Sequence, residues 1–147
     1  MSRKNQLRIK KIFYASTDTK REIPLYSSRV SAGFPSPAED YITRQLDLND
    51  LLIKRPAATF FVEVEGESML EAGIHDGDIL VVDRGEMPAN NKVVVAALDG
   101  ELTVKKIDKI KGKLYLLPEN PNFEPLEITG EMELMIWGIV TYVIHKV

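Results

Sequence analysis

The dipeptide Asp99–Gly100 lies between two strand-like runs and strongly restricts how this chain can fold. Asp-Gly between such runs is a strong signal for a two-residue hairpin turn. It predicts that Val93–Leu98 and Leu102–Ile107 pair as antiparallel neighbours. Further runs bounded by turn signals predict strands at Thr59–Glu65, Asp78–Asp83, Lys92–Leu98, Glu101–Ile107, Lys113–Pro118 and Leu134–Ile144. Many short strands of this kind predict a mainly β fold, a small curled antiparallel domain.

One short helix and an extended N-terminal arm complete the predicted fold. The segment Tyr41–Ile53 is expected to form the helix, with Asp47 or Asn49 as its N-cap and Pro56 beyond its end. The arm holds one weakly apolar, β-like stretch at Leu7–Tyr14. It is too short for a three-helix DNA-binding domain, and it carries no helix-turn-helix pattern.

Composition indicates one ordinary globular domain. The chain has 147 residues, of which 44% are hydrophobic and 28% charged, enough to bury a core without disulfides or metal. It contains no cysteine, which excludes thiol chemistry and fits a reducing cytosol. No run approaches the ~20 apolar residues of a membrane span, and the N-terminus lacks the apolar core of a secretory signal. We therefore expect a cytoplasmic protein.

Charge is distributed unevenly along the chain. Residues 1–30 carry eight Lys/Arg against two Asp/Glu, a net charge of +6, which leaves −9 for residues 31–147. A basic arm can contact nucleic acid or its own acidic domain, and we favour a solvated arm that packs partly on the domain. The acidic body argues against sequence-specific DNA binding, because phosphate contacts need clustered Lys/Arg.

Ser68 is the candidate nucleophile. It follows the alternating strand Thr59–Glu65 and the glycine at 66, a position where a hydroxyl is exposed to a substrate. A serine needs an activating base. The chain has no cysteine and only His75 and His145 as histidines, so a lysine is the expected base. By spacing alone, a serine at this position is more often a turn or cap residue.

Two adjacent lysines are candidates for that base. Period-2 alternation puts Lys106 on the apolar face with Leu102 and Val104, and puts Lys105 on the face of Thr103. The pattern alone therefore nominates Lys106, and a solvated strand end is the plain interpretation of the pair. A base must be neutral, and burial can lower a lysine pKa from ~10.4 by up to ~3–5 units.

Metal or cofactor binding is not expected. D-G-D is mainly a turn signature, and no pair of ligands has recognisable metal-site spacing. The potential ligands around this turn are His75, Asp76, Asp78 and Asp83.

The motifs G-E-S-M, D-G-D-I-L-V-V-D and D-G-E-L-T-V-K-K resemble, in this order, those of the self-cleaving Ser/Lys family of LexA repressor and UmuD. The segment R-V-S-A-G-F-P-S-P-A-E-D-Y is similar to the cleavage region of UmuD and MucA. The resemblance runs from about Val30 to the C-terminus and does not cover residues 1–28. It implies that Ser68 is the nucleophile, that Lys105, the first lysine after T-V, is the general base, and that the cut falls at Ala32–Gly33. The backbone N–H of Ser68 would stabilise the oxyanion, with a second donor unassigned.

The resemblance also implies a biological role. Self-cleavage, promoted by the RecA filament on single-stranded DNA, would remove the arm 1–32 during the SOS response and leave the domain 33–147. The processed form would be a homodimer and an accessory subunit of a UmuC-like, error-prone translesion DNA polymerase. The last strand run would supply either core or dimer contacts. Cleavage within one chain and cleavage between partners both stay open.

Three other functions compete with this interpretation. A non-catalytic polymerase-binding subunit would not need intact Ser68, Lys105 and Ala32–Gly33. A LexA-like transcriptional repressor would need a DNA-binding domain, which is not recognisable here. A signal-peptidase-like enzyme shares the Ser/Lys logic but would need a membrane anchor.

Overall fold

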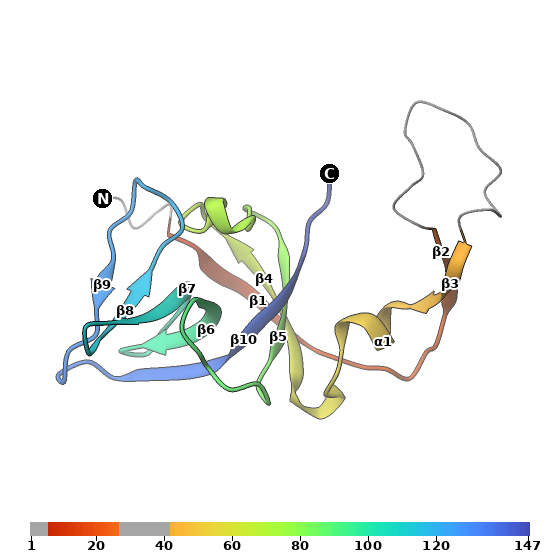
Figure 1. The fold of residues 1–147 in the computed structure, drawn as a ribbon, viewed down its shortest axis with the longest axis horizontal. Helices are drawn as coiled ribbons and strands as arrows, with labels where there is room; N and C mark the ends of the chain where they lie inside the picture. Colours follow the sequence, from red (N-terminus) through yellow and green to blue (C-terminus); the bar gives the residue numbers. More distant parts are fainter. Residues whose placement is uncertain (1–5, 27–41) are drawn as a thin grey trace.

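A computed structural model describes residues 6–26 and 42–147. In this part of the chain the strands form one eight-stranded and one two-stranded antiparallel sheet (Figure 1). The larger sheet has, in spatial order, β1 (Arg8–Tyr14), β4 (Thr59–Glu65), β5 (Ile79–Asp83), β10 (Leu134–Ile144), β6 (Lys92–Leu98), β7 (Glu101–Ile110), β8 (Lys113–Leu117) and β9 (Leu126–Glu127). The smaller sheet pairs β2 (Glu22–Tyr26) with β3 (Ile42–Asp47) and projects to one side. The mainly β prediction is confirmed.

The predicted hairpin is present. β6 and β7 pair in register from Lys92↔Ile107 to Leu98↔Glu101, and the turn between them is Asp99–Gly100. Both turn residues have positive φ, 49° and 85°, as a type I′ turn requires. The chemistry of the turn therefore sets the register that carries Lys105.

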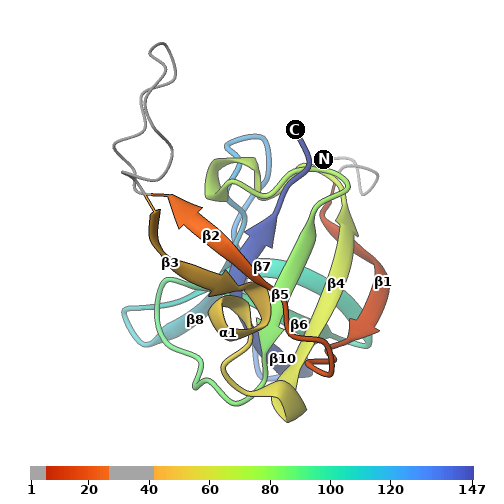
Figure 2. The same ribbon diagram turned by 90° about the vertical axis from the view of Figure 1, so that its right-hand side faces the viewer.

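The larger sheet curls on itself, so that its edge strand β1 approaches β7. Figure 2 shows β7 passing behind β4 and β5. Two buried clusters fill the curl. The first contains Leu7, Phe60, Val62, Val64, Met69, Ile74, Leu80, Val82, Val95 and Val104; the second contains Val94, Ala96, Ile107, Leu116 and Ile139. Val104 and Ile107 belong to different clusters, so β7 is covered on both faces.

The predicted helix at Tyr41–Ile53 is wrong over most of its length. Residues 42–47 form β3, and only α1 (Leu48–Leu52) is helical. Pairing with β2 supplies the backbone hydrogen bonds of β3, and this tertiary contact overrides the local helix pattern. Asp47 is the N-cap, as one of the two predicted candidates, and its side chain accepts the N–H of Asn49 at 2.8 Å. Short 3₁₀ turns follow at Pro56–Ala58 and Leu70–Ala72.

The N-terminal segment is part of the large sheet. β1 pairs with β4 from Arg8↔Glu65 to Tyr14↔Phe60, and Leu7 just before it is 1% exposed in the first cluster. Most side chains of β1 itself are exposed. The predicted packing of the arm on the domain is thus an edge strand anchored by one buried leucine. In the described residues, no helix is long and apolar enough to cross a membrane.

Candidate active site

Ser68 lies in the turn between the end of β4 and the 3₁₀ turn Leu70–Ala72. The loop before β9 holds this turn in place by backbone and side-chain hydrogen bonds. The Glu119 N–H donates to the Ser68 carbonyl at 2.9 Å, and Asn120 Nδ2 donates to the Glu67 carbonyl at 2.8 Å. The Ser68 side chain is fully buried, so the fold fixes the position of its hydroxyl.

Lys105 lies on β7 with its ammonium directed at this hydroxyl. Nζ of Lys105 is 3.1 Å from Oγ of Ser68. It also donates to Oγ1 of Thr103 at 3.0 Å and to the carbonyl of Val104 at 3.1 Å. An ammonium has three donors, and these three acceptors satisfy them. Lys105 is only 8% exposed.

Burial changes the acid–base behaviour of Lys105. Desolvation lowers the pKa of its ammonium from the usual 10.5 to about 8, because the charged form loses its hydration. A lysine with this pKa is partly neutral near pH 7 to 8. It can therefore accept the proton of a hydroxyl at hydrogen-bond distance.

Lys106, the residue that alternation favoured, faces elsewhere. Its Nζ forms an ion pair with Glu119 Oε1 at 2.8 Å, and its side chain is 30% exposed. Because the curled sheet buries both faces of β7, Val104 and its neighbour Lys105 are both buried. The structure brings Lys105, and not Lys106, to Ser68.

A groove of about 710 Å³ runs between the N-terminal segment and β7. Lys105 lines the groove from one side and the residues 6–9 from the other. The N–H of Leu7 donates to Oγ of Ser68 at 2.9 Å. The close approach requires Gly66: a Cβ there would lie 2.2 Å from the Gln6 carbonyl oxygen, and its φ is +110°. The N-terminal segment therefore covers the candidate nucleophile.

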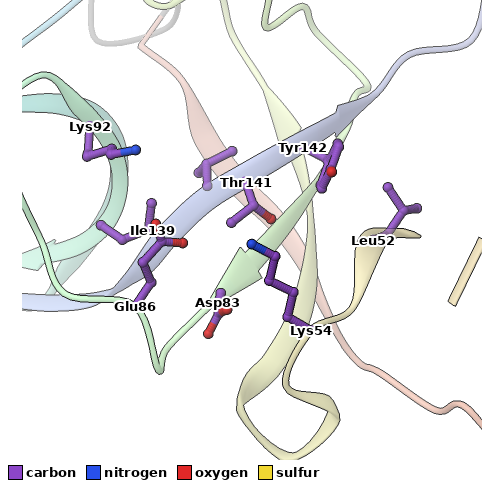
Figure 3. Close-up of a pocket in the computed structure, with 9 residues that line it drawn as sticks. Leu52, Lys54, Asp83, Glu86, Lys92, Ile139, Thr141 and Tyr142 are labelled. Carbon is purple, nitrogen blue, oxygen red and sulfur yellow. The ribbon is translucent and has the colours of Figure 1, made fainter. Parts of the chain in front are cut away.

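A second pocket, of about 310 Å³, shares no lining residue with this groove (Figure 3). Figure 3 shows the ammonium of Lys54 and the carboxylate of Glu86 reaching into it from different segments. Asp83, also in its lining, is held by Arg55 through an ion pair of 2.5 Å. Ser68 and Lys105 do not line this pocket.

The family resemblance named Ser68 and Lys105, which the structure brings together, but sequence reasoning missed the residues that support them. Alternation places Thr103 on the same strand face as Lys105, so the sequence did contain a signal for their hydrogen bond. It contained no signal for the contacts of Leu7 with Ser68 and of Asn120 with Glu67, because these residues are 61 and 53 positions apart in the chain. The predicted cleavage site, Ala32–Gly33, lies outside the described residues.

A buried serine hydrogen-bonded to a lysine of lowered pKa, beside a groove on a β-rich domain, suits the chemistry of a serine peptidase, which needs a hydroxyl nucleophile with a base in reach. Comparisons with known proteins agree with this class. A family model described as Peptidase S24-like matches residues 24–141. The chain belongs to this family and is a peptidase of it.

Individual relatives place the chain more closely within this family. The protein SamA of Salmonella typhimurium strain LT2 is 50% identical over 123 residues, 84% of this chain and 85% of SamA. The protein MucA of Escherichia coli is 42% identical over 121 residues, 82% of each chain. The LexA repressor of Bordetella petrii is 38% identical over 118 residues, 80% of this chain and 52% of the repressor. Within the family, the chain is a UmuD-like protein of SOS mutagenesis.

Proposed function

We propose that this protein cuts its own backbone between Ala32 and Gly33, with Ser68 as nucleophile and Lys105 as general base. The observation that carries the proposal is the buried contact of 3.1 Å between Lys105 Nζ and Ser68 Oγ. The pKa of about 8 for Lys105 supports it, since a usable fraction of the lysine is neutral near physiological pH. Membership in a peptidase family supports the reaction class.

The reaction proceeds through an acyl-enzyme. Neutral Lys105 accepts the hydroxyl proton of Ser68 while Oγ attacks the carbonyl carbon of Ala32. The backbone N–H of Ser68 stabilises the tetrahedral oxyanion. Protonated Lys105 then gives its proton to the amide nitrogen of Gly33, which leaves, and an ester joins Ser68 to Ala32. Lys105 next deprotonates a water molecule, which hydrolyses the ester and frees Ser68.

Tethering makes this chemistry feasible for a modest catalyst. When the scissile bond belongs to the same assembly, Ser68 meets it at a high effective concentration. Part of the entropy cost of bringing nucleophile and substrate together has then already been met. The segment that carries Ala32–Gly33 connects β2 to β3, whose ends at Tyr26 and Ile42 are paired. This small sheet projects to one side of the large sheet, far from the end of β4 and the helical turn that follows it (Figure 1), which favours a reaction that needs rearrangement or a second copy of the chain.

The UmuD-like relationship supports the biological partners of this proposal. The RecA filament on single-stranded DNA promotes the cut, and the processed homodimer serves a UmuC-like translesion polymerase as accessory subunit. The end of β10 supports self-association, because it exposes apolar side chains at Tyr142, Val143 and Ile144.

Intact-mass spectrometry tests the cut directly. Purified protein is incubated at neutral pH and at about pH 10, with and without RecA filament. We expect a fragment that begins at Gly33 in the wild type and in Lys106→Ala, and none in Ser68→Ala or Lys105→Ala. Lys106→Ala is the matched control, because it removes the neighbouring lysine. Wild type that stays whole under all conditions would refute the proposal.

Mixing separates cleavage within one chain from cleavage between chains. A mass-tagged Ser68→Ala protein is incubated with unlabelled wild type. Tagged fragment at a rate that rises with wild-type concentration indicates cleavage between chains. Uncut tagged protein beside fully cut wild type indicates cleavage within one chain.

A further inference from the structure

Three potential metal ligands converge away from the groove: His75, Asp78 and His145. Their ligand atoms all lie within 4.8 Å of one another. His75 and Asp78 belong to the turn that leads into β5, and His145 follows the last residue of β10. Figure 1 shows the C-terminal end of β10 beside the start of β5. The ladder sets this arrangement, because Ile144 pairs with Ile79 directly next to Asp78.

The carboxylate of Asp78 is fixed before any ion binds. Asp78 is 2% exposed, and its backbone carbonyl accepts the N–H of Val64 at 2.9 Å. Its Oδ2 accepts the backbone N–H of His75 at 2.8 Å, which sets the plane of the carboxylate. Its Oδ1 lies 2.5 Å from Nδ1 of His145. Such second contacts to a ligand are what orients it in known metal sites.

A His–Asp hydrogen bond alone explains only one of the two imidazoles. Nδ1 of His75 is 3.8 Å from Oδ2 of Asp78, too long for a hydrogen bond. Its ring nevertheless lies beside that of His145, with centroids 4.8 Å apart and planes inclined by 39°. Both rings thus approach one buried carboxylate from the solvent side, and each remains about half exposed.

We propose that His75, Asp78 and His145 bind one divalent transition-metal ion of the zinc type. Two imidazoles and a carboxylate suit Zn²⁺, whereas Mg²⁺ and Ca²⁺ prefer oxygen ligands alone. Bonds of ~2.0–2.2 Å place tetrahedral ligand atoms about 3.3 Å apart. The 2.5 Å and 3.8 Å separations, which end on the two different oxygens of Asp78, lie on either side of this value, and all three ligand atoms lie within 4.8 Å of one another. The two half-exposed imidazoles would therefore move to close the site around an ion.

The ion would act as a clasp on the C-terminus. It joins the residue after β10 to the turn between Ser68 and β5, two segments 67 residues apart. The half-exposed rings leave a fourth position open to water. Because the clasp is absent from the unfolded chain, the ion would stabilise the folded protein. The clasp takes no part in the proposed cleavage.

Cobalt and zinc binding test the clasp in a tag-free full-length chain. Ser68→Ala serves as background, so that the chain stays whole whatever its peptidase activity. We expect one Co²⁺ per chain with the visible absorption of a tetrahedral site, and displacement by one Zn²⁺ in calorimetry. Zinc at about a hundred times its Kd should raise Tm by roughly 5–10 °C over the EDTA-treated protein.

Variants of the exposed ligands localise the binding. His75→Gln and His145→Gln should each lower zinc affinity at least tenfold and abolish the cobalt spectrum, while Tm in EDTA stays near that of the background protein. Glu131→Gln, at an exposed carboxylate outside the cluster, is the control and should bind as the background does. An octahedral cobalt spectrum, half an ion per chain, or zinc binding that survives both histidine substitutions would overturn the proposal.

Discussion

The pH dependence of self-cleavage should follow the protonation of Lys105. With a pKa of about 8, the neutral fraction is about 9% at pH 7, about 50% at pH 8 and about 90% at pH 9. At the usual pKa of 10.5 it would be only about 0.03% at pH 7. Burial therefore increases the working base roughly 300-fold at neutral pH.

First-order rate constants, measured by intact mass from pH 6 to 10.5 without activator, give the profile. We expect the rate to rise about fivefold from pH 7 to pH 8, less than twofold from pH 8 to pH 9, and then to level off. The Lys106→Ala variant should give the same profile. A thermal melt at each pH shows that the protein remains folded over the range.

A different profile would refute this account of the site. A rate that keeps rising about tenfold per pH unit up to pH 10 would mean that the base titrates at the usual lysine pKa, without desolvation. A pH profile that shifts in Lys106→Ala would mean that Lys106, and not Lys105, is the base. A flat profile would mean that a step other than proton transfer limits the rate.

Three further predictions concern stability. Below pH 8 the folded protein holds a buried ammonium, a cost of about 3 kcal/mol that is relieved as the pH rises from 8 to 10.5. Lys105→Met should therefore raise the free energy of unfolding in urea by up to that amount at pH 7, and by less at pH 10.5. Gly66→Ala should lower Tm or release the residues 6–7, seen as faster amide exchange there, since its Cβ would overlap the Gln6 carbonyl. Leu7→Ala should loosen β1 by roughly 2–5 kcal/mol, measured by amide exchange of that strand.

The fold was predictable where strands were marked locally. Thr59–Glu65, Lys92–Leu98 and Leu134–Ile144 have the predicted bounds, because turn signals flank alternating or apolar runs. β2 and β3 were not predicted, since each depends on the other across the intervening segment. The two-residue β9 likewise gains its conformation only from pairing with β8.

The site was only partly predictable from pattern. Alternation says which side chains share a face of β7, but it cannot say which of two covered faces meets the serine. Val104 lies in the first buried cluster and Ile107 in the second, so neither face is the solvent side near Lys105. The resemblance to the Ser/Lys family selected Lys105, the first lysine after T-V, and the curl of the sheet gives the physical reason. His145 escaped attention as a ligand because its partner Asp78 is 67 residues away.

The proposed cut changes the large sheet as well as the length of the chain. The segment 1–32 contains β1, which pairs with β4, and Leu7, which is buried in the core. Breaking Ala32–Gly33 leaves those contacts intact, so the segment departs only when the burial of Leu7 and the β1 hydrogen bonds are given up. Once it departs, β4 becomes an edge strand, and the groove beside Lys105 loses the wall that residues 6–9 form. An exposed edge accepts a new strand from another chain, so cleavage would create a binding surface that the uncut protein covers with its own N-terminus.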